Sequence, residues 1–258
     1  MRPEISLEGV SHTFGTGKEA LPVLDGLSFA CETGSFTAIV GPSGCGKSTV
    51  TRLVSGLLIP DQGTVMLEGA PVRSPRASVG MAFQNPVLLE WRSILDNVLL
   101  PLEIVASDLS QKARKDRARH LLHLVGLEGF EDSKPSQLSG GMRQRASLCR
   151  ALVHRPKVLI LDEPFGALDA FTREDLWQVM TDLRKEESFT CLLITHDLRE
   201  SVFLADTVVV LSGRPASVQH IVEIDLGTER QIDVLYEPQA VAILAELRHQ
   251  IQIAQGRA

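Results

Sequence analysis

The sequence lacks the features that would place it across a membrane, outside the cell or on nucleic acid. No stretch approaches the ~18 uninterrupted apolar residues that a membrane-spanning helix needs. The N-terminus carries no apolar signal segment, so we expect the protein to stay in the cytoplasm. The four cysteines lie far apart and without metal-ligand spacing. The net charge of −6 argues against nucleic acid as the main partner, because binding a phosphate backbone requires a basic face.

The composition is that of a soluble globular protein. Hydrophobic residues make up 44% of the chain and charged residues 22%, and the sequence contains no internal repeat and no low-complexity segment. A chain of 258 residues is long enough to bury one large core. We therefore predict a single domain with lobes.

The strongest chemical signal is a glycine-rich loop at residues 41–49. It fits the pattern G-x-x-x-x-G-K-[ST], with an apolar run at 36–40 before it and a helix-compatible run at 48–58 after it. In this setting the backbone N–H groups converge on one anion, Lys47 neutralises phosphate charge and the Ser48 hydroxyl ligates Mg²⁺. A plain glycine-rich turn is the alternative, which the flanking strand and helix disfavour. The predicted nucleotide-binding residues of the loop are Gly41, Pro42, Ser43, Gly44, Cys45, Gly46, Lys47, Ser48 and Thr49.

A short apolar run at residues 158–161 ends in two carboxylates, Asp162 and Glu163. Consecutive apolar residues are typical of a strand buried on both faces, and ligands gather at the carboxyl ends of such strands. Asp162 suits a contact to Mg²⁺ through water, and Glu163 suits a residue that orients or deprotonates an attacking water. An acidic turn after a strand is the alternative, and it would be preferred if the phosphate loop were absent.

The segment 138–145, Leu-Ser-Gly-Gly-Met-Arg-Gln-Arg, precedes a helical stretch that reaches His154. With the two motifs above, it resembles the ATP-binding subunit of ABC transporters, whose signature is LSGGQ or a near variant. The resemblance implies a P-loop NTPase (RecA-like) α/β fold, in which helices flank a mostly parallel sheet, with an N-terminal antiparallel β part and an inserted helical lobe. It also implies ATP hydrolysis, with ATP and Mg²⁺ as cofactors.

The signature turn also implies a homodimer. In the family, the turn of one subunit closes over the ATP that its partner holds, and here this turn is Ser139, Gly140 and Gly141. Physically, the same residues expose backbone N–H groups at a helix N-terminus, which is a second anion site. They also make a helix cap, and the two interpretations are compatible.

The resemblance assigns roles to four further residues. Phe14 resembles the aromatic residue that stacks on adenine, although a lone Phe after a strand is usually part of the core. Gln84 resembles the glutamine that contacts Mg²⁺, and the segment that ends at Asp169 resembles the loop that crosses the dimer interface. His196 resembles the histidine that hydrogen-bonds the γ-phosphate, although a histidine after an apolar strand is more often structural. We therefore expect Glu163 and His196 to be the catalytic residues, with Ser48, Gln84 and Asp162 at the metal.

The order of elements divides the chain into four parts. We predict a β part with the phosphate-loop core at 1–84, a helical lobe at 85–150, the rest of the core at 151–212 and a tail at 213–258. Further elements predicted from periodicity are a helix at 111–125, strands at 190–195, 207–211 and 221–224, and a helix from about Pro238. Asp197 and Glu200 form a candidate helix-capping pair.

The segments 85–98 and 211–215 resemble importers of the nitrate, sulfonate and taurine class, although Glu90 departs from the pattern of that class. The class implies two membrane-spanning permease subunits, an extracytoplasmic solute-binding protein and a peripheral position on the cytoplasmic face of the membrane. Trp91 is either an anchor for a short helix of the membrane subunit or a core residue. The competing functions are an exporter or lipid-trafficking ATPase, a soluble ABC ATPase acting on DNA or ribosomes, and a small-molecule kinase.

Cys45 lies inside the phosphate loop and near a helix N-terminus. A thiol at such a position tends to have a lowered pKa. We therefore expect a reactive thiol, whose alkylation blocks hydrolysis and which ATP protects.

Overall fold

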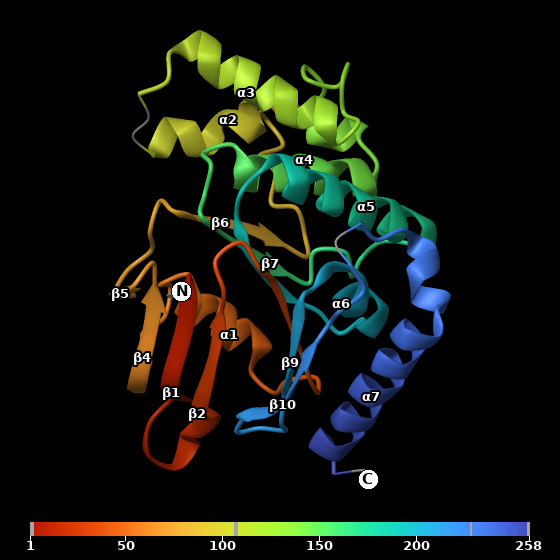
Figure 1. The fold of residues 1–258 in the computed structure, drawn as a ribbon. Helices are drawn as coiled ribbons and strands as arrows, with labels where there is room; N and C mark the ends of the chain where they lie inside the picture. Colours follow the sequence, from red (N-terminus) through yellow and green to blue (C-terminus); the bar gives the residue numbers. More distant parts are fainter. Residues whose placement is uncertain (1–2, 106–107, 228, 257–258) are drawn as a thin grey trace. The chain divides into compact units, whose positions relative to one another are not determined.

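The computed structural model describes residues 3–105, 108–227 and 229–256, which form two compact units (Figure 1). Unit 1 consists of Met1–Arg76 and Thr190–Ala258, and unit 2 consists of Ala77–Phe189. Each unit carries its own strands and helices. The division into four parts made from the sequence remains a prediction.

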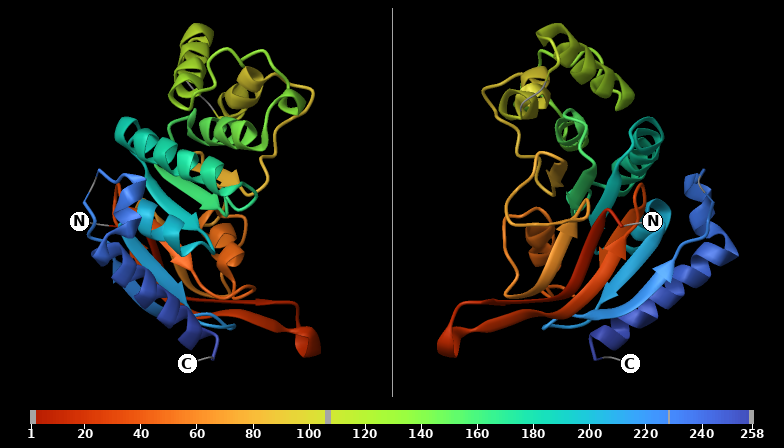
Figure 2. Two further views of the ribbon diagram at one scale, coloured as in Figure 1. Left: turned by 90° about the vertical axis from the view of Figure 1, so that its right-hand side faces the viewer. Right: turned by 60° about the vertical axis from the view of Figure 1, so that its left-hand side comes forward.

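An antiparallel sheet begins unit 1, with strand order β2-β1-β4-β5. Its strands are β1 (Ile5–Phe14), β2 (Leu21–Cys31), β4 (Gln62–Leu67) and β5 (Ala70–Pro71). β1 and β2 form a long hairpin, drawn in red in Figure 2, with the 3₁₀ turn η1 (Gly17–Glu19) at its tip. Apolar side chains alternate along β1, so Ile5, Leu7 and Val10 are buried while their neighbours are not.

The second sheet of unit 1 is mostly parallel. In it β9 (Thr207–Leu211) and β8 (Thr190–Ile194) pair in parallel with β3 (Phe36–Val40), and β10 (Val218–Glu223) pairs antiparallel with β9. Every residue of β3 and β8 is buried, as expected of strands covered on both faces. These positions confirm the strands predicted at 36–40, 190–195, 207–211 and 221–224, with shifts of a few residues at their ends.

The helices of unit 1 are α1 (Lys47–Val54), α6 (Leu198–Leu204) and α7 (Pro238–Ala254), with a 3₁₀ turn η3 (Ile232–Tyr236) before α7. α1 is shorter than the predicted run to residue 58. The cause is Gly56, which adopts φ 76°, and Leu57 N–H donates back to the Arg52 carbonyl at 2.9 Å, a glycine-terminated helix end. The helix predicted from about Pro238 is confirmed as α7.

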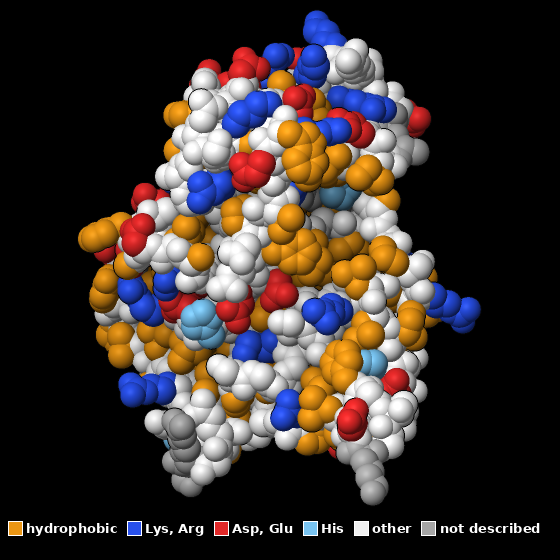
Figure 3. Space-filling view, turned by 180° about the vertical axis from the view of Figure 1, so that it is seen from behind, with side chains coloured by type: hydrophobic (Ala, Val, Ile, Leu, Met, Phe, Trp, Pro, Cys, Tyr) orange, Lys and Arg blue, Asp and Glu red, His pale blue; other side chains and the backbone are white. Residues whose placement is uncertain are grey.

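In its described residues, unit 2 combines a parallel strand pair with four α-helices. β6 (Val79–Phe83) pairs with β7 (Val158–Asp162), while α4 (Gly140–Leu152) and α5 (Ala170–Glu186) pack against each other. α2 (Ile94–Ile104) and α3 (Gln111–Leu124) complete the helical part, and a 3₁₀ turn η2 (Pro135–Gln137) precedes α4. On the face seen in Figure 3, charged side chains of both signs are interspersed with apolar and uncharged ones over this helical part.

Side-chain caps determine where the helices of unit 2 begin. The hydroxyl oxygens of Ser93, Ser110 and Ser139 accept hydrogen bonds from backbone N–H groups at the starts of α2, α3 and α4, and Asp169 does the same for α5. The predicted helix at 111–125 is confirmed as α3. The expected cap at Ser139 is also confirmed, so the signature turn is a helix N-terminus.

Gly80 in β6 provides a test of the packing in unit 2. A Cβ atom at this position would lie 2.1 Å from the carbonyl oxygen of Ala151 in α4. The contact is with backbone, so we expect Gly80→Ala to destabilise the protein by about 1–3 kcal/mol in urea denaturation. Gly140→Ala is the matched control, because its Cβ would meet only a Leu168 methyl group at 3.8 Å. Equal stability of the two variants would contradict the packing described here.

Candidate functional site

The phosphate loop of unit 1 connects β3 to α1. Gly46 directly precedes α1 with φ 125°, and a Cβ there would lie 2.8 Å from a Val23 methyl group of β2, so the position requires glycine. Lys47 is only 7% exposed, and its Nζ donates to the carbonyl oxygens of Gly41 at 3.0 Å and Pro42 at 3.1 Å. The loop therefore curls around its own lysine, at the positive end of α1.

His196 emerges beside this loop. β3 and β8 run parallel with Ile39 opposite Ile194, and Thr195 N–H donates to the Ile39 carbonyl at 3.2 Å. Because the carboxyl ends of parallel strands meet at one edge of a sheet, His196 and the loop that begins at Gly41 leave unit 1 at the same edge. His196 is exposed there. Unit 1 thus brings together the two motifs that lie about 150 residues apart in the sequence.

Phe14 ends β1, in the antiparallel sheet of unit 1. It pairs with Leu21 of β2 and is partly exposed, and its ring meets His12 edge-on with 4.7 Å between the ring centroids. Its partial exposure means that Phe14 is not a core residue. Gly46 of the phosphate loop lies against Val23 of the same strand β2. Strand β2 therefore contacts both Phe14 and the phosphate loop.

Unit 2 brings Gln84, Asp162 and Glu163 together by the same strand geometry. Phe83 lies opposite Asp162 in the parallel pair of β6 and β7, so Gln84 and Glu163 are the next residues at that edge. Gln84 is exposed, and the two carboxylates are partly exposed. Glu163 has φ 48°, a left-handed conformation that is uncommon outside glycine and that typically marks functional turns.

The signature turn and Asp169 are also neighbours in unit 2. Ser139 Oγ accepts from Met142 N–H at 3.3 Å, and a Cβ on the buried Gly141 would lie 2.5 Å from a Thr172 methyl group. Asp169 accepts from both the N–H of Thr172 at 3.0 Å and its hydroxyl at 2.7 Å. These hydrogen bonds lower the pKa of Asp169, which keeps this exposed carboxylate ionised.

Sequence reasoning missed Gln144, which follows the signature turn on α4. This side chain is 1% exposed, and its Nε2 donates to the Phe83 carbonyl oxygen at 3.0 Å. The hydrogen bond connects the signature helix to the residue directly before Gln84. A glutamine in a basic helical run gives no sequence signal for such a contact, because only the fold brings α4 against the end of β6.

The candidate metal ligands are oxygen donors of the kind that Mg²⁺ prefers, namely Ser48, Gln84 and Asp162. Among the residues that the structure describes, no group of three or more His, Cys, Asp or Glu side chains forms a protein-only metal cluster. Mg²⁺ is usually held by one or two protein ligands together with substrate phosphates and water. The residues present therefore suit a metal that arrives with a nucleotide.

Cys45 differs from the expectation of a reactive thiol. The residue is only 2% exposed, and burial raises the pKa of its thiol, outweighing the opposite effect of the Lys47 charge. The prediction of a lowered pKa was therefore wrong. The sequence showed the helix N-terminus that favours a thiolate but not the burial that opposes it.

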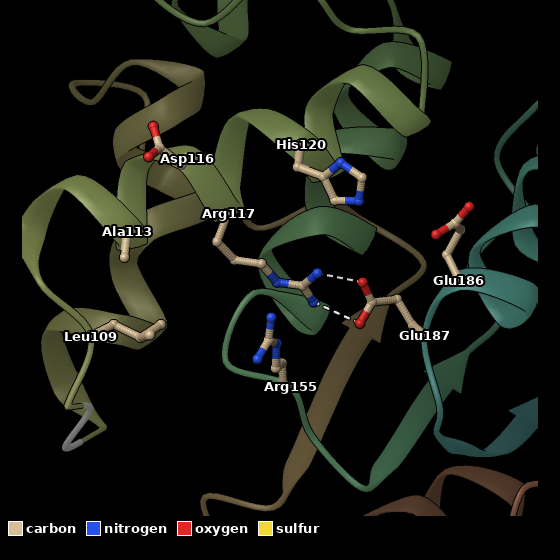
Figure 4. A pocket seen from close by; sticks show the side chains of 8 residues that line it. All are labelled: Leu109, Ala113, Asp116, Arg117, His120, Arg155, Glu186 and Glu187. Atoms are coloured by element: carbon tan, nitrogen blue, oxygen red, sulfur yellow. Dashed lines mark hydrogen bonds and ion pairs between the residues drawn. The ribbon is translucent and has the colours of Figure 1, made fainter.

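A separate pocket of about 590 Å³ lies within unit 2 (Figure 4). Arg117 and Glu187 form a two-pronged ion pair in its wall, so the charge of this arginine is already neutralised. Arg155, which also lines the pocket, precedes β7, whereas Asp162 and Glu163 lie at the opposite end of this strand. None of the residues predicted as functional lines the pocket. The lining residues are Leu109, Ala113, Asp116, Arg117, His120, Arg155, Glu186 and Glu187.

The strand–loop–helix of unit 1 and the parallel strands define the chain as a P-loop nucleoside triphosphatase. Comparison with known proteins specifies the family, since the ABC transporter family pattern matches residues 24–166. The chain therefore belongs to the ABC transporter family and is an ATP-binding, ATP-hydrolysing subunit of that family. The α/β fold predicted from the sequence, with its antiparallel β part and helical lobe, is confirmed.

Relatives align over most of the chain. A nitrate import ATP-binding protein, NrtD, from Synechococcus elongatus is 41% identical over 88% of this chain and 84% of its own. An aliphatic sulfonates import ATP-binding protein, SsuB, from Bacillus cereus is 37% identical over 88% of both chains. An uncharacterised ABC transporter ATP-binding protein from Methanocaldococcus jannaschii is 39% identical over 89% of this chain and 85% of its own.

Solved structures give the same assignment. The ATP-binding cassette MJ0796, solved as a dimer bound to ADP and Pi, matches with a TM-score of 0.75 and 29% identity over 86% of this chain and 99% of its own. The protein cbiO1 from Clostridium perfringens, part of the cbiONQ transporter complex, matches with a TM-score of 0.78 and 25% identity over 99% of this chain and 98% of its own. Within the described residues, no helix is both long and apolar enough to span a bilayer.

The raised pKa of Cys45 predicts slow alkylation. At pH 7 we expect iodoacetamide to modify Cys45 far more slowly than a free cysteine thiol, with a rate that rises about tenfold per pH unit as the thiolate fraction grows. Mass spectrometry of the native protein measures this rate, and Cys31, whose pKa burial raises to about 12, is the unreactive control. Once Cys45 is modified, hydrolysis should be blocked, and ATP should protect. Labelling of Cys45 at the rate of a free thiol at pH 7 would contradict the burial argument.

Proposed function

We propose that this chain is the ATPase subunit of an ABC importer for a small anionic solute of the nitrate, sulfonate or taurine kind. The observation that carries the proposal is the 37–41% identity to subunits named for import of sulfonates and of nitrate and for transport of bicarbonate. The stretches at 85–98 and 211–215 support the same class. An exporter or lipid-trafficking ATPase is the alternative function. The features that distinguish an importer from an exporter lie largely in the membrane subunits and not in this chain.

The proposed assembly contains two copies of this chain and two membrane-spanning permease subunits, with an extracytoplasmic solute-binding protein. The dimeric cassette MJ0796 supports the pair of ATPase subunits by analogy, and cbiO1, part of the ABC transporter complex cbiONQ, supports their place in a larger transporter complex. In it, the chain lies at the cytoplasmic face of the membrane. Each copy offers the same loop and the same signature turn, which suits a two-fold contact.

ATP is held by groups from both copies in this proposal. The loop N–H groups and Lys47 hold the phosphates, and Phe14 stacks on the adenine. Ser139, Gly140 and Asp169 reach the nucleotide of the second copy, since all three are exposed. The remaining loop and turn residues shape the backbone that contacts the phosphates. Those residues are Gly41, Pro42, Ser43, Gly44, Cys45, Gly46, Thr49 and Gly141.

Ser48, Gln84 and Asp162 are the residues that would hold Mg²⁺. When bound, the ion supplies positive charge to the phosphate oxygens. Glu163 orients or deprotonates the attacking water, a role that fits its carboxylate at the end of β7 and its left-handed backbone. His196 hydrogen-bonds the γ-phosphate. ATP binding then favours a closed dimer, and loss of the γ-phosphate removes that preference.

The Glu163→Gln variant tests the catalytic assignment. The amide cannot accept the water's proton, so we expect ATP turnover to fall at least about 10²-fold while ATP binding persists. The ATP-loaded variant should therefore stay a stable dimer, which size-exclusion chromatography with ATP detects. Glu186→Gln is the matched control, because this exposed carboxylate lies in the pocket at the other end of β7.

Two results would contradict this account. Rapid turnover by Glu163→Gln would remove the catalytic role, and a monomer that hydrolyses ATP with Ser139 replaced at no cost would remove the shared site. Lys47→Ala should behave differently from Glu163→Gln, because it weakens ATP binding as well as turnover.

Importer function predicts that solute stimulates hydrolysis in the assembled complex. Reconstituted with its permease and binding protein, the ATPase should respond to one of nitrate, taurine, an alkanesulfonate or bicarbonate.

Trp91 is 73% exposed, which removes the alternative of a core residue and leaves it available as a docking anchor. Trp91→Ala should therefore reduce stimulation and co-purification with the permease. Ile104→Ala, equally exposed, is the control, and stimulation that survives Trp91→Ala would end the docking role.

A further inference from the structure

The loop that carries His196 is held by a short hydrogen-bond network with a buried glutamate at its base. Glu200 lies in the first turn of α6 and is 2% exposed. Its Oε2 accepts a hydrogen bond from the Thr195 hydroxyl at 3.0 Å. Thr195 is also 2% exposed and directly precedes His196. The capping pair expected from the sequence is borne out for Asp197, which accepts hydrogen bonds from the N–H groups of Arg199 and Glu200, while the Glu200 carboxylate accepts from Thr195.

The hydroxyl of Thr195 connects Glu200 to the residue after His196. It accepts a hydrogen bond from Asp197 N–H at 3.0 Å while donating to Glu200. A hydroxyl has a single hydrogen to donate, so the Glu200 acceptor directs that hydrogen and leaves a lone pair for Asp197 N–H. One carboxylate thereby fixes the backbone on both sides of the histidine.

Both neighbours of His196 are also anchored to regular structure. Thr195 N–H donates to the Ile39 carbonyl at the end of β3. The Asp197 carboxylate caps α6 by accepting from Arg199 N–H at 2.9 Å. An exposed imidazole is thus carried on a backbone that cannot move without breaking these hydrogen bonds.

We propose that Glu200 is a positioning residue for His196. Through Thr195 it holds the histidine loop in the one conformation that presents the imidazole to the γ-phosphate, and it touches no reacting atom itself. This inference rests on the proposed role of His196. A displacement of about 1 Å in a positioned group can cost about 10²-fold in rate, so a remote hydrogen bond has a measurable effect.

Two substitutions of Glu200 separate the hydrogen bond from the volume of the side chain. Glu200→Leu removes the acceptor at similar size, and we expect kcat for ATP hydrolysis by the full-length protein to fall about 10- to 100-fold. KM for ATP should stay within about threefold, because the phosphate loop is unchanged. Glu200→Gln keeps an acceptor oxygen, so it should retain most of the rate.

Combination with His196→Ala identifies the route of the effect. If Glu200 acts through His196, then Glu200→Leu should lower kcat by less than about twofold in the His196→Ala background. Ile5→Ala, at a fully buried position in β1, is the control for general destabilisation. It should lower Tm without changing kcat. If Glu200→Leu fails to fold, Thr195→Val replaces it in the same comparison, with Thr195→Ser as the conservative variant.

The outcomes distinguish the inference from the function on which it rests. A Glu200→Leu loss that multiplies with that of His196→Ala, or a Glu200→Gln as slow as Glu200→Leu, would overturn the positioning role alone. Full kcat in His196→Ala by itself would instead remove the proposed role of His196. If the losses in kcat from Glu200→Leu and His196→Ala do not multiply, and Glu200→Gln retains most of the rate, then Glu200 is established as the support of the histidine loop.

Discussion

The parallel pairing of β3 with β8 is the constraint on which the chemistry of unit 1 depends. Backbone hydrogen bonds set Ile39 opposite Ile194, and so they set the start of the phosphate loop level with His196. A slip of one residue would move the histidine by about 3.3 Å along the strand, a distance larger than a hydrogen bond tolerates. Because both strands are buried over their whole length, such a slip would also disrupt the core.

In unit 2, parallel pairing of neighbouring strands also brings functional side chains together, though different ones. The pairing of Phe83 with Asp162 places an amide and two carboxylates at the ends of two neighbouring strands. The Gln144 side chain then adds a hydrogen bond to the Phe83 carbonyl, which ties α4, the helix that begins at the signature turn, to the end of β6. In each unit, therefore, short buried strands bring together residues that are far apart in sequence.

Much of this arrangement could be predicted from the sequence because its signals are local. Runs of consecutive apolar residues identified β3, β7 and β8, and the glycine pattern identified the phosphate loop. Features that depend on what packs from elsewhere could not be predicted. The burial of Cys45 reversed the expected pKa shift, and the 73% exposure of Trp91 decided between two open alternatives. The inward direction of Glu200 likewise follows from tertiary packing, since an Asp-x-x-Glu spacing alone favours a cap.

α6 is a helix of seven residues, too short to be stable in isolation. Its last turn is held by Arg230 from the tail, whose guanidinium donates to the carbonyl oxygens of Val202, Phe203 and Ala205. Its first turn carries the carboxylate that supports the histidine loop. The C-terminal segment is consequently a structural part of the ATPase rather than an appendage. A chain truncated before Arg230 would lose the hydrogen bonds that hold the last turn of α6. The surroundings of His196, more than thirty positions upstream, would lose their order as a result.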